Sequence, residues 1–221
     1  VLIVTLALIV LLVITGAIWW AISVSSRTAA GSEIPLGALP ADTGMGVVEL
    51  AVHDRQAMQT YYEDAVGLQV IDESDDTVTL GRGVPLIRLV ASDGQEQASF
   101  DEAGLYPSAI LYPDEQALAR VLASIAAVAP ESYQGAADHA VSLAFYFVDP
   151  EGNGLELYVD RPRDQWVWEN GLVSMGTAPL DPNAFIQEHL AGATASTAEM
   201  GHVHLKVGDL EGDEQVFRAM R

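Results

Sequence analysis

The chain has 221 residues, which is enough for one good-sized domain or two small ones. Its 31 acidic and 10 basic residues give a formal net charge of −21, and it contains no cysteine. The composition leaves no basic patch to neutralise phosphates, so it argues against a nucleic-acid partner. The lack of cysteine excludes disulfides, a thiolate nucleophile and zinc held by cysteine.

The N-terminal 26 residues, VLIVTLALIVLLVITGAIWWAISVSS, carry no charge. A transmembrane α-helix needs about 20 apolar residues, and indole rings such as those of Trp19 and Trp20 favour the headgroup region. We therefore expect residues 1–24 to form one transmembrane helix, which makes the lipid bilayer a partner and the protein a single-pass membrane protein. A cleaved signal peptide is the alternative, although its apolar core is usually about 7–15 residues. An extracytoplasmic position for the remaining chain is expected if a basic segment precedes the helix.

Residues 25–44 are small, polar and rich in Pro and Gly, as is typical of a linker. Regular patterning then begins at Met45, with elements in the order strand, helix, strand, strand, strand. The predicted strands are 47–52, 68–73, 76–81 and 85–92, and the predicted helix is 55–67, capped by Asp54.

The next segment begins with the same order of elements. Strands are predicted at 105–112, 142–149 and 153–160, and a helix capped by Asp114 is predicted at 115–128. The turn PEG separates the last two strands, and residues 130–141 look like a loop with room for a short strand. Residues 45–160 therefore consist of two copies of one supersecondary unit.

A third copy begins near the C-terminus. The stretches MGVVELAVHD and MGHVHLKVGD share the pattern M-G-x-V-x-L-x-V-x-D. We interpret residues 199–221 as the start of a third, incomplete module. Residues 161–198 are then a connector, in which Asp181 and Pro182 start a short helix.

The tandem βαβββ unit, with YYEDAVGL after the first strand and DPEGNGLELY near the end of the second unit, resembles the vicinal oxygen chelate superfamily. That superfamily includes glyoxalase I, bleomycin- and fosfomycin-resistance proteins and extradiol dioxygenases. Because GHVHLKVGDL opens a second module pair, the chain is most similar to four-module proteins of the catechol 2,3-dioxygenase type. The resemblance implies an α+β fold over residues 45–160, in which tandem βαβββ modules form a cupped mixed sheet. The transmembrane helix would precede this glyoxalase/dioxygenase fold.

The resemblance also implies that metal ligands project into the cup from the first and last strands of each module. In the first module pair these positions fall on Val47, Arg88, Pro107 and Glu156. Only Glu156 is a metal-ligand type, so we expect no metal in this pair. Glu156 is expected to form a hydrogen bond or an ion pair, with Arg88 across the cup as the proposed partner.

In the third copy the position of Val47 is taken by His202, the ligand type that the resemblance implies for iron in a second module pair. His204 lies two residues on, so it faces the same side of the strand and is expected to contact substrate or support a ligand. The alternative is that both histidines belong to an exposed strand without a metal role. His139, in GAADHAVS, is a candidate general base, although anchoring of a loop is the favoured role. The sequence identifies neither catalytic residues nor residues that bind an organic cofactor.

Two functions follow from the resemblance. The first is a membrane-anchored relative of metal-dependent extradiol dioxygenases, in which iron(II) or another divalent metal binds an aromatic diol. Its remaining ligands would come from a fourth module, so the metal requires a complete second module pair and these 221 residues are expected to be inactive alone. The alternative is a metal-free small-molecule-binding or structural module of the same fold.

Overall fold

The computed structural model describes residues 43–92, 94, 102–192 and 196–219, with side chains as far as Glu214. The helix expected over residues 1–24 and most of the linker expected over residues 25–44 lie outside this range. Among the described residues, no helix is long and apolar enough to cross a membrane. The expected single-pass membrane localisation is corrected to that extent, since the described residues supply no spanning helix. Residues Ala41–Leu210 form one compact unit, and the C-terminal helix belongs to another.

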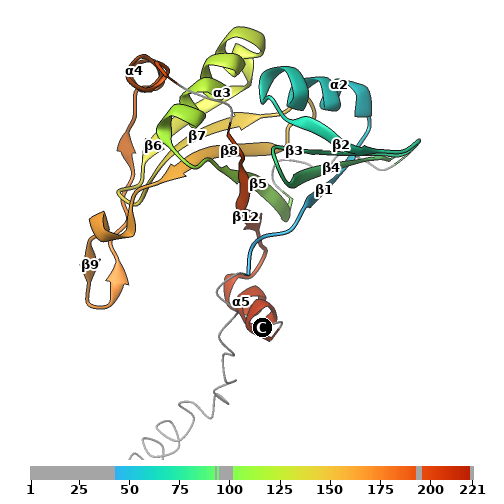
Figure 1. Ribbon diagram of the computed structural model, residues 1–221. Helices are drawn as coiled ribbons and strands as arrows, with labels where there is room; N and C mark the ends of the chain where they lie inside the picture. Colours follow the sequence, from blue (N-terminus) through green and yellow to red (C-terminus); the bar gives the residue numbers. More distant parts are fainter. Residues whose placement is uncertain (1–42, 93, 95–101, 193–195, 220–221) are drawn as a thin grey trace, which may run out of the picture. The chain divides into compact units, whose positions relative to one another are not determined.

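The first module contains a four-stranded sheet and one helical segment (Figure 1). Its elements are β1 (Val48–Val52), α2 (Arg55–Thr60), the π-helical turn η1 (Tyr61–Ala65), β2 (Gln69–Glu73), β3 (Thr77–Gly81) and β4 (Pro85–Ala91). The strand order is β1-β4-β3-β2, with β1 parallel to β4 and the other pairs antiparallel. As predicted, Asp54 caps the helix, and its carboxylate accepts a hydrogen bond from the Ala57 N–H at 2.9 Å.

The second module contributes most of a six-stranded sheet. Its elements are β5 (Gly104–Leu111), α3 (Glu115–Val128), the 3-10 turn η2 (Pro130–Ser132), β6 (Tyr133–Asp138), β7 (Ser142–Val148) and β8 (Gly154–Asp160). Asp114 caps α3 as predicted, accepting from the Ala117 N–H at 2.7 Å. The segment expected to be mainly loop contains β6, which pairs with β7 along its whole length.

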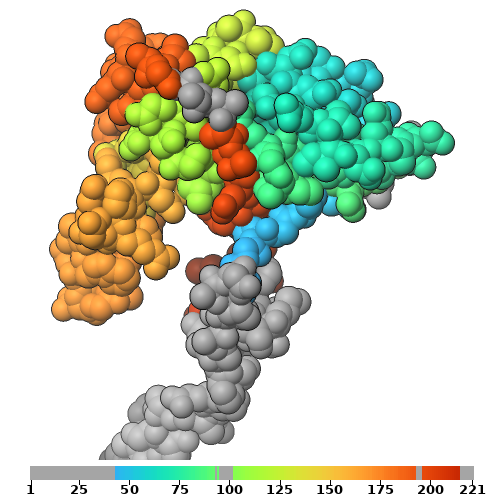
Figure 2. Space-filling view, in the orientation of Figure 1, coloured from blue at the N-terminus to red at the C-terminus, as the bar shows by residue number. Residues whose placement is uncertain are grey.

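The connector and the start of the third module follow. Their elements are η3 (Arg163–Gln165), β9 (Trp168–Glu169), β10 (Leu172–Val173), β11 (Ala178–Pro179), α4 (Pro182–His189), β12 (Glu199–Lys206) and α5 (Leu210–Ala219). In the space-filling view the β9–β10 hairpin, in orange, projects from the body of the two modules (Figure 2). Asp181 caps α4 as predicted, accepting from the Asn183 and Ala184 N–H groups.

The α+β fold with mixed sheets confirms the expected fold class, but the modules do not share one hydrogen-bonded sheet. The second sheet has the order β11-β6-β7-β8-β5-β12, while β1 ends the first sheet. The edge of β5 that β8 leaves free is occupied by β12, which runs antiparallel to it. β12 carries the same sequence pattern as β1, so it offers β5 an equivalent strand, and the expectation of a single cupped sheet is corrected.

The two faces of the second sheet differ sharply. Helices α2, α3 and α4 lie on the same side of the sheets (Figure 1). Along β8 the residues Leu155, Leu157 and Val159 belong to the main core, as alternation along a strand requires. Glu156 and Tyr158 point to the opposite face, where Tyr158 packs in a small cluster with Ala109 and Ala144. This second face carries the polar side chains of interest.

Candidate metal centre

A row of paired residues crosses the second sheet on the face away from the helices. His202 of β12 pairs with Ala109 of β5, Ala109 pairs with Glu156 of β8, and Glu156 pairs with Tyr146 of β7. Adjacent strands lie about 4.8 Å apart, so His202 and Glu156 start about 10 Å apart with only a methyl group between them. Their side chains can therefore meet above Ala109.

A bulge in β12 turns the histidines to this face. The register advances from the pair Met200–Ile110 to the pair His202–Ala109, which leaves Gly201 unmatched. Met200 and Ile110 both belong to the main core. One inserted residue moves the following side chains to the other face of the sheet. The bulge thus directs His202, and His204 two residues later, away from the core.

Three potential ligand atoms converge there. Glu156 Oε2 lies 3.6 Å from His202 Nε2 and 3.4 Å from His204 Nε2, and the two Nε2 atoms are 2.9 Å apart. Ligands about 2.1 Å from one ion lie about 3.0–3.4 Å from one another at octahedral or tetrahedral angles. Glu156 is only 3% exposed, and its Oε2 atom accepts no hydrogen bond from the described residues. A divalent cation fits both the spacing and a buried carboxylate oxygen that accepts no hydrogen bond.

Tyr158 contacts His202, one of the candidate ligands. Its hydroxyl lies 3.2 Å from His202 Nδ1, and the two rings meet edge to face with centroids 5.0 Å apart. Burial, followed by the nearby charges of Asp160 and Glu156, raises the pKa of Tyr158. The phenol is therefore neutral and can accept a hydrogen bond.

The other end of the row holds a tyrosine–histidine pair. His139 Nε2 lies 2.8 Å from the Tyr146 hydroxyl, and His139 Nδ1 lies 2.9 Å from the Gly176 carbonyl oxygen. Because a carbonyl only accepts, Nδ1 carries a proton, and a neutral His139 then accepts from Tyr146. Burial first, and then the charge of Glu156, raises the pKa of Tyr146 to about 12. His139 thus holds the connector in place, the role that the sequence favoured, and it also orients a phenol beside Glu156.

Arg88 does not pair with Glu156. Its Nε donates to Thr79 Oγ1 at 3.2 Å, and its Nη1 lies 3.8 Å from Glu49, both within the first sheet. The expected ion pair across a shared cup is therefore wrong, because the two modules have separate sheets.

Glu156 nevertheless has two potential co-ligands, which come from outside the first module pair. Val47 precedes β1 and is 38% exposed, and Pro107 lies within β5. Neither is a ligand type, but His202 and His204 approach Glu156 from β12. Both histidines belong to the third module, whereas partners of Glu156 were expected inside the first module pair. The H-x-H spacing in the sequence indicated two imidazoles on one face of a strand. No sequence signal indicated that β12 would lie beside β5.

Comparison with known proteins places the chain in a family. It is 33% identical over 183 residues to catechol-2,3-dioxygenase from Bacillus subtilis. The chain belongs to the vicinal oxygen chelate superfamily. The match covers 77% of this chain and 61% of that relative, so this superfamily member spans less than two thirds of the relative's length. No family model matches the chain.

Several solved structures are similar in fold. Fosfomycin resistance protein FosX from Listeria monocytogenes gives a TM-score of 0.43 at 13% identity, with coverage of 56% of this chain and 97% of that one. A glyoxalase/bleomycin resistance protein/dioxygenase from Alicyclobacillus acidocaldarius gives 0.40 at 16% identity, with coverage of 54% and 95%. The cppA protein from Streptococcus pneumoniae gives 0.47 at 11% identity, with coverage of 73% and 58%.

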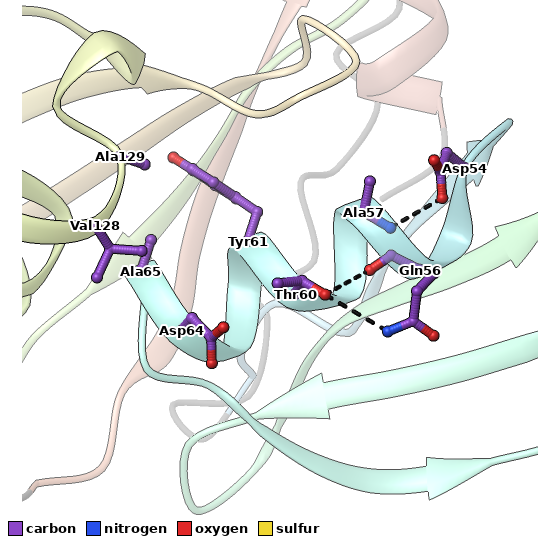
Figure 3. Close-up of a pocket in the computed structure, with 9 residues that line it drawn as sticks. All are labelled: Asp54, Gln56, Ala57, Thr60, Tyr61, Asp64, Ala65, Val128 and Ala129. Carbon is purple, nitrogen blue, oxygen red and sulfur yellow. Dashed lines mark hydrogen bonds between the residues drawn. The ribbon is translucent and has the colours of Figure 1, made fainter.

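In this vicinal oxygen chelate protein a cavity of about 500 Å³ lies apart from the candidate metal centre. It is lined by Asp54, Gln56, Ala57, Thr60, Tyr61, Asp64, Ala65, Val128 and Ala129. Figure 3 shows the Tyr61 side chain pointing from η1 towards Ala129, while the Thr60 hydroxyl donates back to the Gln56 carbonyl. None of the converging ligands lines this cavity, so it provides no substrate space beside them.

Proposed function

We propose that this protein is a metal-dependent relative of the extradiol dioxygenases and that Glu156, His202 and His204 hold a divalent cation, iron(II) above all. The convergence of their three ligand atoms supports the proposal, because one of them is a buried carboxylate oxygen that accepts no hydrogen bond from the described residues. Two histidines and one carboxylate on one side of an ion are typical of non-haem iron(II) oxygenases, since open positions remain for substrate. Bound there, the metal would bring two adjacent oxygens of an aromatic diol and dioxygen together.

The surrounding residues suit a small oxygen-rich substrate. The side chains of His202 and His204 are 40% and 51% exposed, so the open side of the centre faces solvent. Tyr146, oriented by His139, places a neutral hydroxyl on the same row as Glu156. Because its proton is donated to His139, the hydroxyl oxygen can accept a hydrogen bond from a hydroxyl group of the substrate. The aromatic diol itself is inferred from the similarity to catechol-2,3-dioxygenase.

The position of β12 beside β5 changes the expected set of metal ligands. Glu156 and His204 take places that were expected to be filled from a fourth module. A centre built from the second module and β12 would hold metal within these residues. Metal binding and ring cleavage are therefore separate questions for this chain, because substrate contacts can come from residues beyond the centre.

A metal-free binding module of the same fold is the second candidate. The 2.9 Å contact between the two Nε2 atoms favours it, since one neutral imidazole can donate to the other without an ion. In that state the exposed edges of the histidines would bind a small polar ligand beside Glu156.

Metal titration distinguishes the two functions. After treatment with a chelator, the 221-residue chain is titrated with cobalt(II) and zinc(II) by calorimetry, and with iron(II) without oxygen. We expect one equivalent to bind, with Glu156→Gln, His202→Ala and His204→Ala each losing at least about 100-fold in affinity. His189→Ala on α4, where the imidazole lies beside Glu188, is the matched control and should bind normally. Less than stoichiometric binding by the unaltered chain would reject the metal centre and favour the metal-free module.

Activity is tested separately on the iron-loaded protein. Catechol is added with oxygen, and formation of the ring-opened product is followed by absorbance. Turnover that Glu156→Gln removes would establish the dioxygenase. Stoichiometric metal without turnover would retain the metal centre but reject dioxygenase activity for this chain.

A further inference from the structure

Tyr158 is rigidly placed directly beside the candidate metal centre. It lies two residues after Glu156 on β8, so both side chains project from the same face of the sheet. It is 6% exposed and packs against Ala109 and Ala144, whose small side chains leave room for the phenol ring. A buried aromatic ring held on a central strand can serve as a fixed support for a neighbouring group.

Gly201 allows the Tyr158 hydroxyl to reach β12. A Cβ atom at position 201 would overlap that hydroxyl and also crowd the adjacent ring carbons. Gly201 is also the unmatched residue of the bulge that directs His202 to this face. Two structural constraints therefore favour glycine at position 201, and both concern the orientation of His202.

The hydrogen bonds around His202 are consistent with one assignment of donors and acceptors. A metal ligand must present an unprotonated Nε2, which leaves the proton on Nδ1 in need of an acceptor. The Tyr158 hydroxyl, 3.2 Å from Nδ1, is such an acceptor. His202 Nε2 can then accept from His204 Nε2, 2.9 Å away, until a cation displaces that proton. Among the described residues, Nδ1 of His204 has no equivalent partner.

We propose that Tyr158 is a positioning residue: its hydroxyl accepts the Nδ1 proton of His202 and keeps the Nε2 lone pair directed at Glu156 and His204, in the space that Gly201 leaves free. The functional value of this hydrogen bond rests on the proposed metal function. The hydrogen bond itself, and the tautomer that it selects, can be measured without metal.

The first test is nitrogen NMR of the metal-free chain at about pH 8, where free imidazoles are neutral. Long-range nitrogen–proton correlations report which ring nitrogen of His202 carries the proton. We expect the Nδ1–H form in the unaltered protein and a substantial Nε2–H fraction in Tyr158→Phe. Tyr112→Phe is the control, because Tyr112 is another buried tyrosine, directly after β5, and its hydroxyl makes no hydrogen bond to the described residues. An Nε2–H form in the unaltered protein, or no change in Tyr158→Phe, would overturn the proposal.

The second test is zinc affinity by competition with a coloured chelator. Loss of a hydrogen bond to a metal-bound histidine typically costs about 10–100-fold in affinity, and we expect this loss for Tyr158→Phe and Gly201→Ala but not for Tyr112→Phe. An unchanged affinity in Tyr158→Phe would overturn the positioning role. If the unaltered chain shows the Nδ1–H form but binds no zinc, the proposed metal function fails while the hydrogen bond stands.

Discussion

The Tyr62 hydroxyl in the first module donates a hydrogen bond to Asp149 Oδ2 in the second module at 3.0 Å, and both residues are buried. Asp149 begins the turn between β7 and β8. Two residues later, the Glu151 carboxylate accepts from the backbone N–H groups of His53 and Asp54 at 2.8 and 2.7 Å. One turn of the second module thus contacts the first module just before α2 and within η1. The modules are joined by these contacts although their sheets are separate.

Removing the Tyr62 hydroxyl should loosen this junction. A hydrogen bond to a charged group contributes about 1.5–3 kcal/mol, so we expect Tyr62→Phe to lower the free energy of unfolding by about that amount. Tyr112→Phe is the control, since its hydroxyl has no hydrogen-bond partner among the described residues, and it should be neutral. Urea unfolding of both variants gives the comparison. Equal changes in the two variants would show that the contact between the modules contributes nothing specific.

Asp149 should make stability fall as pH rises. Burial raises its pKa above the ordinary value of 3.8, although hydrogen bonds from Asn153, Tyr62 and the Glu151 N–H oppose the shift. A raised pKa in the folded state contributes stability below the unfolded pKa, and that contribution is lost as pH rises through the folded pKa. Asp149→Asn removes this titration. Its free energy of unfolding should therefore improve relative to the unaltered protein between about pH 3 and 7 in urea titrations, and a relative decline would contradict the raised pKa.

Asp138 should have the opposite effect on the pH dependence of stability. Burial acts to raise its pKa, but hydrogen bonds from the Ala140 N–H and from Arg161, with an Nη2–Oδ2 distance of 2.6 Å, lower it below 3.8 overall. A lowered pKa contributes stability above the unfolded value, and that contribution is lost as pH falls through the folded pKa. Asp138→Asn should therefore lose stability relative to the unaltered protein as pH rises from about 2 to 5. The same urea series measures it, and a relative gain in stability of Asp138→Asn over this range would contradict the lowered pKa.

Local sequence signals predicted most helices and strands of this fold. The errors concern which strands pair in the tertiary structure. The caps at Asp54, Asp114 and Asp181 were confirmed because each depends on a side chain and the next backbone N–H groups. The partner of β5 could not be predicted, since β1 and β12 share one pattern and pattern alone does not choose between them. Glu156 was therefore recognised as a ligand type without its partners, which arrive through β12.

Metal should slow hydrogen exchange in β12. The proposed centre takes two ligands from β12 and one from β8, so a cation binds only when β12 is paired with β5. At a free zinc concentration about 100 times the dissociation constant, the docked state gains about 2.7 kcal/mol. Amides of β12 that exchange by local undocking should then slow by about 100-fold, while those of β3 should not change. Equal protection with and without zinc in a protein that binds it would show that metal binding and docking are not coupled.

The small side chain of Ala109 should be essential to the centre. Ala109 is fully buried in β5, and the side chains of His202 and Glu156 meet above it. Ala109→Val retains a residue that favours strands but adds two methyl groups in that space. We expect zinc affinity to fall by at least about 10-fold, with a loss of about 1–3 kcal/mol in the free energy of unfolding from overpacking. Ala51→Val, at an exposed position on β1, is the control and should leave affinity unchanged. Calorimetry with zinc and urea unfolding of both variants separate the two effects. Full zinc affinity in Ala109→Val would mean that the histidines and Glu156 do not converge over this strand.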